Sequence, residues 1–157
     1  MKFSAQEEYG LRCLIRVAKL QHLKKGLTIP EISQSEGISQ HNTAKILRLL
    51  RIGGFLESER GQLGGYKLSR KPENIFIKDV LDSLGGRLYD ETFCESHSGI
   101  TNICTNSIDC SVRSVWKMIQ QAVDDVISNL TLNDLLGAEI SIFQDNFSNV
   151  FQNPSAE

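Results

Sequence analysis

The spacing of apolar residues predicts a mainly α-helical chain that contains one small β-hairpin. Over residues 3–24, apolar side chains recur at intervals close to the helical repeat. Ser4 precedes this stretch as a candidate N-cap, and Glu7 lies at the capping-box distance from it. We therefore expect a first helix that begins just after Ser4.

Two shorter helices separated by a tight turn are expected next. Thr28 can cap a helix over residues 30–36, and Gly37 is suited to end it in a left-handed backbone conformation. Ser39 then caps a helix that runs to about Ile52. A helix, a tight turn and a second helix are typical of DNA-binding proteins in which the second helix enters the major groove.

The second of these helices has a core side and a polar side. The core side is expected to hold Ala44, Ile46, Leu47, Leu49 and Leu50. The outer face and the exposed first turn are expected to carry His41, Asn42, Thr43, Lys45, Arg48 and Arg51. Of these, His41 and Asn42 are suited to reading base edges, whereas the basic side chains are suited to contacting phosphates.

A hairpin follows, with strands expected over residues 55–60 and 66–69 and a glycine-containing turn between them. Glycines permit close approach to a sugar-phosphate chain, and Arg60 and Lys67 flank the tip. We interpret this hairpin as the wing of a winged helix-turn-helix. The full predicted DNA-binding set is Thr28, Ser39, Gln40, His41, Asn42, Thr43, Lys45, Arg48, Arg60, Gln62, Gly64, Gly65, Tyr66 and Lys67.

Three more helical segments are expected in the second half. Residues 72–86 resemble one helix, and residues 132–136 a short final one. Between them, apolar positions recur every three or four residues from Ile108 to Leu130, over about six turns. So long an amphipathic helix in so small a protein needs a partner helix, most simply that of a second copy.

The expected organisation has four parts. Residues 1–86 form a winged helix-turn-helix DNA-binding domain, and residues 87–111 form a cysteine loop that binds a cluster. A dimerisation helix and its C-terminal cap occupy residues 107–137, and residues 138–157 form a flexible tail. The fold class is therefore mainly α with a small β-hairpin.

Charge is unevenly distributed along the chain of 157 residues, whose net charge is -2. Residues 40–71 carry 7 basic and 2 acidic side chains, whereas residues 72–157 carry 4 and 13. A positive region on an acidic chain favours local binding of phosphates. The sequence has no apolar run of membrane-spanning length and no signal-peptide core, so a cytoplasmic location is expected.

Three cysteines, Cys94, Cys104 and Cys110, lie in a short segment rich in polar residues and glycine. In a reducing cytoplasm, clustered thiols bind metals or perform redox chemistry more often than they form disulfides. This segment predicts a metal or iron-sulfur site whose state is reported to the DNA-binding region. Cys13, which lies among apolar residues of the first helix, is expected to be a buried core residue.

Several motifs together resemble one family. Residues 60–66 match its Arg-Gly-x-x-Gly-Gly-Tyr wing, residues 131–135 its Thr-Leu-x-x-Leu ending, and residues 9–12 its first helix. Over about residues 1–137 the chain resembles the winged-helix bacterial repressors that include the iron-sulfur cluster assembly regulator and the nitric-oxide-sensitive repressor. The resemblance implies a homodimer that binds a palindromic operator in double-stranded DNA, with an iron-sulfur cluster near the dimer interface.

The resemblance also bears on the fourth cluster ligand. Where one member of the family has a histidine ligand after the last cysteine, this chain has Arg113, which cannot ligate iron. Another member uses an acidic residue from its partner's first helix, and the matching position here is Glu8. The resemblance thus implies the three cysteines and Glu8 of the partner subunit as ligands, with His97 as the competing fourth ligand. A 4Fe-4S cluster is favoured, and a 2Fe-2S cluster is also compatible.

The expected function is a transcription repressor whose operator affinity depends on a cluster that senses nitric oxide, oxygen or iron-sulfur status. The alternative is a winged-helix regulator without a cluster, controlled by thiol oxidation, zinc, a metabolite or a partner protein. An enzyme is not expected. The sequence has no nucleophile-base set, phosphate loop or pair of catalytic carboxylates beside the cysteines.

Overall fold

The computed structural model describes residues 4–23, 26–59, 64–89, 92–98, 104 and 108–137. Helix α1, Ala5–Leu20, begins as predicted. The Ser4 hydroxyl accepts a hydrogen bond from the Glu7 N–H, and the Glu7 carboxylate accepts one from the Ser4 N–H. This reciprocal cap satisfies backbone donors that the start of a helix otherwise leaves unpaired. The predicted capping box is confirmed.

Helices α2, Ile29–Glu36, and α3, Gln40–Ile52, form the predicted helix-turn-helix. Gly37 ends α2 in the left-handed region, with a φ of 67°. The Ser39 hydroxyl accepts a hydrogen bond of 3.3 Å from the Asn42 N–H and thereby caps α3. Both boundaries follow from local chemistry, and the sequence predicted both.

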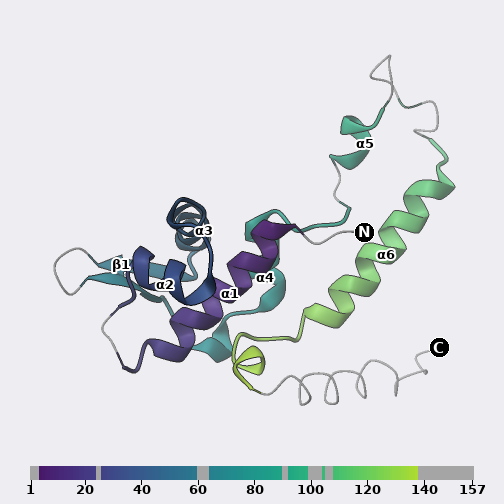
Figure 1. Ribbon diagram of the computed structural model, residues 1–157. Helices are drawn as coiled ribbons and strands as arrows, with labels where there is room; N and C mark the ends of the chain where they lie inside the picture. Colours follow the sequence, from purple (N-terminus) through teal and green to yellow (C-terminus); the bar gives the residue numbers. More distant parts are fainter. Residues whose placement is uncertain are drawn as a thin grey trace.

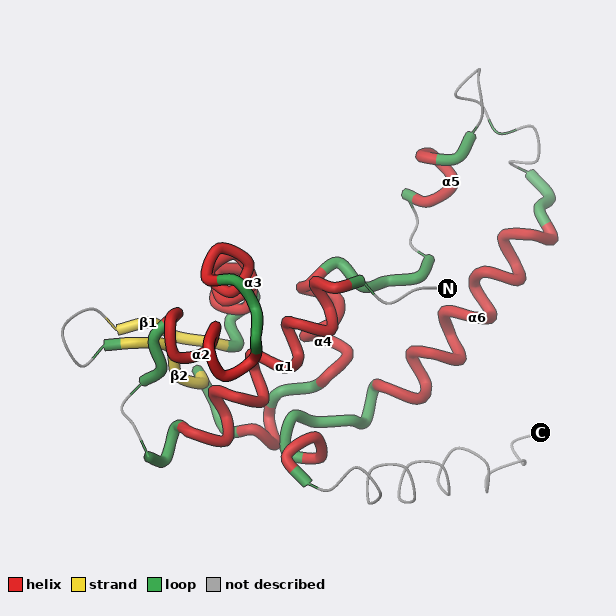
Figure 2. The backbone as a smooth tube through the Cα atoms, viewed as in Figure 1, coloured by secondary structure: helices red, strands yellow, loops and turns green. Residues whose placement is uncertain are grey.

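The wing consists of β1, Leu56–Glu59, and β2, Gly65–Leu68, which pair as antiparallel strands (Figure 2). Leu27 adds a bridge to this hairpin, because its N–H and C=O both bond to the backbone of Tyr66, at 2.9 and 2.7 Å. A Cβ on Gly65 would lie 2.8 Å from backbone atoms of Leu27. This glycine is therefore required by the close approach of the chain to itself.

The helix predicted over residues 72–86 is present, but it begins later than predicted. This stretch contains a 3₁₀ turn, η1, Pro72–Asn74, followed by helix α4, Ile77–Leu84. The two are separated because Phe76 forms an antiparallel β-bridge with Thr131. The backbone at the break bonds to a distant part of the chain and so cannot continue a helix.

Two hydrogen bonds of 2.8 Å fix this bridge. The Ile77 N–H donates to the Leu130 carbonyl, and the Leu132 N–H donates to the Ile75 carbonyl. The following 3₁₀ turn, η2, Asp134–Leu136, packs against α1. The chain therefore returns to its first half after the long helix.

The long helix α6, Ser111–Ile127, is confirmed and begins at Cys110, which is its N-cap. A short helix that was not predicted, α5, Phe93–Ser96, precedes it. Figure 1 shows α6 running away from the first half of the chain, with α5 on the side away from the hairpin. The predicted tail, residues 138–157, lies outside the described residues.

We call α1 to α4, the hairpin, η1 and η2 the head, and we call residues 87–89, 92–98, 104 and 108–128 the arm. The head has one core, to which every one of its helices and strands contributes; its fully buried large side chains include Leu14, Leu27, Ile32, Leu47, Leu50, Leu56, Ile75, Val80, Leu84 and Leu132. The arm has the opposite character. Its large apolar side chains Ile108, Val112, Val115, Trp116, Met118 and Val126 are exposed. Within the described ranges, no helix has the length and apolar character needed to cross a membrane.

Candidate nucleic-acid interface and cysteine site

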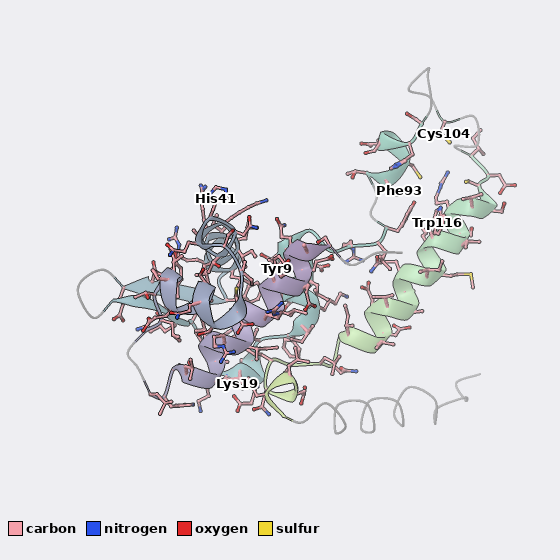
Figure 3. All side chains as sticks on the ribbon, viewed as in Figure 1. Tyr9, Lys19, His41, Phe93, Cys104 and Trp116 are labelled. Atoms are coloured by element: carbon pink, nitrogen blue, oxygen red, sulfur yellow. The ribbon has the colours of Figure 1, made fainter. Side chains whose placement is uncertain are left out.

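Helix α3 presents a continuous polar surface. Figure 3 shows His41 at the outer end of this helix, pointing away from the rest of the head. The residues that share this exposure are Gln40, His41, Asn42, Lys45, Arg48 and Arg51. The predicted outer face of the helix is therefore present, and it combines hydrogen-bonding groups with three positive charges.

Thr43 is not part of this surface, and its predicted place on the outer face is wrong. Its side chain is fully buried, and its hydroxyl donates a hydrogen bond of 3.0 Å to the Ser39 carbonyl. A threonine can occupy a core position when its hydroxyl bonds to the preceding turn of the helix. Thr43 thus supports the recognition helix from inside.

Thr28 and Ser39 lie at the exposed starts of α2 and α3. Both hydroxyls are already used as helix caps, and that of Thr28 also donates to the Glu31 carboxylate at 2.8 Å. The backbone N–H groups at such helix starts favour nearby anions. Contacts of either residue with DNA remain a prediction.

The wing carries a cation that is paired within the free protein. Lys67 forms an ion pair with Glu59 and lies 3.8 Å from the Glu57 carboxylate. The hydrogen bond and charge of Glu59 raise the pKa of Lys67 above its usual value. The contact of Lys67 with DNA remains a prediction, and in the free protein its charge is already paired with a carboxylate.

The rest of the predicted wing contacts divide into two groups. Gly64, Gly65 and Tyr66 are half-buried in the hairpin. Arg60 and Gln62 lie outside the described residues. For all five, a role in DNA binding stays a prediction.

The four cysteines are all free thiols, and they occupy two different environments. Cys13 is fully buried in the core of the head, as predicted. Burial raises the pKa of its thiol to about 11, with a further contribution from the charge of Glu36. Cys94, Cys104 and Cys110 are half-buried on the arm, and Figure 3 shows Cys104 at the end of the arm that lies away from the hairpin.

Cys94 belongs to α5 and contacts an aromatic cluster. Its sulfur lies 3.5 Å from the hydroxyl of Tyr89, and this hydrogen bond raises the pKa of Tyr89 above its usual value. The Tyr89 ring lies 5.5 Å from that of Phe93, and Phe93 stacks on His97 at 4.1 Å. Sequence reasoning did not identify Tyr89, because no local pattern distinguishes it from an ordinary tyrosine.

Cys110 lies at the start of α6. Its sulfur accepts a hydrogen bond of 3.4 Å from the Arg113 N–H and so caps the helix. Arg113 thus contributes its backbone N–H, and not its side chain, to this sulfur.

The three thiols of the arm fit a metal site by their chemistry, because none is in a disulfide and thiolates are the usual ligands of iron-sulfur clusters. Their arrangement in a single chain does not complete such a site. Among the residues that the structure describes, no three His, Cys, Asp or Glu side chains are grouped closely enough to hold a metal ion. Glu8 is exposed on α1, and the ring orientation of His97 is set by its stacking on Phe93.

Comparison with known proteins gives a consistent result. Residues 3–138 match the model of the Rrf2 family, described as an iron-dependent transcriptional regulator. The HTH-type transcriptional regulator CymR of Bacillus subtilis strain 168 is 30% identical over 135 residues, which are 86% of this chain and 89% of CymR. The HTH-type transcriptional regulator IscR of Vibrio vulnificus strain YJ016 is 28% identical over 149 residues, which are 92% of this chain and 85% of IscR.

A solved structure agrees with the sequence comparison. The structure of CymR, the global cysteine regulator of B. subtilis, superposes with a TM-score of 0.67 at 28% identity. The match covers 87% of this chain and 96% of that one. The predicted fold class, mainly α with a winged helix-turn-helix, is confirmed.

Proposed function

Because the chain belongs to the Rrf2 family of transcriptional regulators, we propose that it is a dimeric repressor whose operator affinity depends on an iron-sulfur cluster. Regulation of transcription by binding DNA follows from the family. The finer proposal rests on one observation above all. Three free thiols lie on the arm, outside the core, along the chain between the head and the amphipathic helix α6.

The dimer is supported by the exposed apolar side chains of α6. Val112, Val115 and Met118 follow one another at helical spacing and are all exposed in the single chain. Exposed apolar surface of this kind is removed from water when a second amphipathic helix packs against it. Two identical heads related by a twofold axis bind a palindromic operator with half-sites about one helical turn apart.

The DNA interface consists of the outer face of α3 and the wing. His41 and Asn42 are placed to read base edges, while Lys45 and Arg48 are placed to meet phosphates. At the starts of α2 and α3, the sugar-phosphate backbone of the DNA is approached by Thr28, Ser39 and Gln40. The wing adds Arg60, Gln62, Gly64, Gly65, Tyr66 and Lys67. Thr43 is left out of this interface because it is buried.

Cys94, Cys104 and Cys110 would hold the cluster, and Glu8 of the partner subunit is the first choice for the fourth ligand, with His97 as its competitor. A bound cluster, of the 4Fe-4S type by preference and of the 2Fe-2S type otherwise, supplies a group that nitric oxide or oxygen can modify. Tyr89 and Arg113 hold two of the sulfurs by hydrogen bonds in the single chain. A carboxylate ligand binds iron more weakly than a thiolate and suits a site that must respond to its surroundings.

Anaerobic reconstitution with iron and sulfide tests the cluster. Wild-type protein should become coloured and should bind a selected operator fragment with an affinity different from that of the metal-free protein. Alanine substitution of Cys94, Cys104 or Cys110 should abolish the colour, whereas Cys13→Ser should keep it because Cys13 lies in the core of the head. Colourless wild-type protein would contradict the cluster.

A regulator without a cluster is the second candidate, and the similarity to the global cysteine regulator CymR favours it. In this case thiol chemistry at Cys94 or Cys110, rather than iron, changes DNA affinity. Metal-free protein treated with hydrogen peroxide separates the two. A reversible change in affinity that survives chelators and is lost with Cys94→Ala or Cys110→Ala supports the thiol mechanism.

A further inference from the structure

Gln120 is the buried residue of α6, whereas the apolar Ile119 and Val123 beside it on the helix are only half-buried. Burying a polar amide costs free energy unless its hydrogen bonds are made. The Gln120 carbonyl oxygen bonds to the segment that connects the head to the cysteines, and its NH₂ group bonds to Asp124. Its position therefore needs an explanation beyond the packing of the helix.

The Gln120 side chain holds that connecting segment by its backbone. Its Oε1 accepts hydrogen bonds from the N–H groups of Leu88 and Tyr89, at 2.9 and 3.0 Å. Two consecutive backbone donors bound by one carbonyl oxygen fix both the position and the direction of a short stretch of chain. Tyr89 is thereby oriented with respect to α6.

The other end of the Gln120 amide bonds within α6. Its Nε2 donates a bond of 2.9 Å to Asp124, one turn later in α6. The second oxygen of Asp124 lies 3.0 Å from the guanidinium of Arg87 and 3.6 Å from the ammonium of Lys78 in α4. Burial alone would raise the pKa of Asp124, but the Gln120 bond and these two cations lower it below its usual value.

Tyr89 extends the same series of contacts to the cysteine site. Its N–H is held by Gln120, and its hydroxyl lies 3.5 Å from the sulfur of Cys94. In the other direction, Lys78 belongs to α4, which packs against the recognition helix α3. A continuous set of polar contacts thus joins Cys94 to the head through α6.

We propose that Gln120 is a positioning residue that couples the state of the cysteine site to the DNA-binding head. Any change at Cys94 that moves Tyr89 must either break the two bonds to Gln120 or shift α6 with them. A shift of α6 acts on Asp124 and, through Lys78, on α4. This inference rests on the proposed function, in which the thiols control DNA affinity, and it adds the residue that transmits the control.

The test compares two glutamines with parallel environments. Gln120→Leu removes the acceptor for Leu88 and Tyr89 at nearly constant volume. Gln121→Leu is the matched control, because Gln121 is exposed and its side chain bonds to the aspartate one turn later, Asp125 at 2.7 Å, in the same way that Gln120 bonds to Asp124. Asp124→Asn serves as a second variant, because asparagine keeps the shape of the aspartate side chain and removes only its charge.

Two quantities are measured for each variant. The first is amide hydrogen exchange at Leu88 and Tyr89, which should become roughly fivefold to tenfold faster in Gln120→Leu, as expected for losing a hydrogen bond of about 1 kcal/mol. The second is the ratio of operator dissociation constants between metal-free protein and protein reconstituted with iron and sulfide. The probe is a DNA fragment that the wild-type protein selects from random sequence.

Coupling through Gln120 predicts that this ratio falls by at least about threefold in Gln120→Leu and in Asp124→Asn, while Gln121→Leu keeps the wild-type ratio. The proposal is overturned if Gln120→Leu, folded and with faster exchange, retains the full ratio, or if Gln121→Leu loses as much. If the wild-type ratio is itself 1, the proposed cluster control fails and the coupling fails with it. The exchange data then still report whether Gln120 holds the segment.

Discussion

In the head, Leu14 and Leu47 are fully buried, whereas in α6 of the arm Val112 and Met118 keep 58% and 72% of their surface exposed. Both regions are built from amphipathic helices. The head closes its apolar faces against one another, because α1 packs against three other helices and the wing. Among the residues that the structure describes, the arm has one long helix, α6, and no second long helix packed against its apolar face.

This difference teaches that the two regions depend on different sources of stability. Removing apolar surface from water stabilises a fold by about 25 cal/mol for each Å², and the head obtains this within one chain. The arm is held to the head by the ion pair between Asp124 and Lys78 and by the bridge at Phe76. In the proposed dimer, a second copy covers the apolar face of α6.

The largest effect is expected from substitutions that make the exposed apolar face of α6 polar. Val115→Asp combined with Met118→Asp should prevent dimer formation, because each buried apolar side chain contributes roughly 1.5–3 kcal/mol. Sedimentation velocity at micromolar concentration should show a monomer with a folded head. Gln121→Asp, which adds a charge to an exposed polar position, should remain a dimer, and a dimeric double variant would place the interface elsewhere.

The core of the head provides the converse test. Leu47→Ala should lower the free energy of unfolding by about 2–5 kcal/mol, because it leaves a cavity among closely packed neighbours. Met118→Ala should change the unfolding of the head by less than about 0.5 kcal/mol. Chemical denaturation of the head, followed at low protein concentration, measures both. Similar losses in the two variants would mean that α6 is part of the folding unit of the head.

Thiol reactivity separates the same two regions. Because the pKa of Cys13 is raised to about 11, its thiolate is about a hundredfold scarcer at neutral pH than that of an ordinary cysteine. Iodoacetamide should therefore modify the three cysteines of the arm in metal-free protein well before Cys13. Mass spectrometry of the peptides gives the rates, and protein unfolded in urea is the control in which all four should react alike. Early modification of Cys13 would show that the head opens readily.

The smallest effect is expected at the wing, where the head pairs the positive charge of Lys67 with its own Glu59. Glu59→Gln should free Lys67 from its ion pair and so raise DNA affinity by a few-fold. The slope of log K against log salt concentration should steepen by up to about 1, as expected for one additional effective phosphate contact. Glu73→Gln removes an equal charge outside the wing and is the control. An unchanged slope in Glu59→Gln would remove Lys67 from the interface.

Local chemistry made most of the head predictable. Ser4 with Glu7, Gly37 and Ser39 mark helix boundaries by bonds that span only a few residues, so the sequence alone identified them. The sequence predicted the wing from two short strand patterns on either side of a glycine-containing turn. Thr43 was misplaced because a hydroxyl that bonds to its own helix looks, in the sequence, like one that faces solvent.

The contacts that could not be predicted join residues far apart in the chain. Phe76 interrupts a helical pattern because Thr131 pairs with it, and no pattern near residue 76 announces that partner. Gln120 reads as one more polar residue on an amphipathic helix, although it binds the backbone of Leu88. The complete ligand set of the proposed cysteine site could not be predicted from local patterns either, since that site takes one ligand from another chain.

The β-bridge between Phe76 and Thr131 joins the chain just before the arm begins to the chain just after it ends. The arm is therefore a long insertion whose two ends are held together at the head. This bridge keeps the two ends of the arm side by side. The gaps of nine and five residues between the thiols lie within this closed stretch. A change at the cysteines therefore acts on a segment that is anchored to the head at both of its ends.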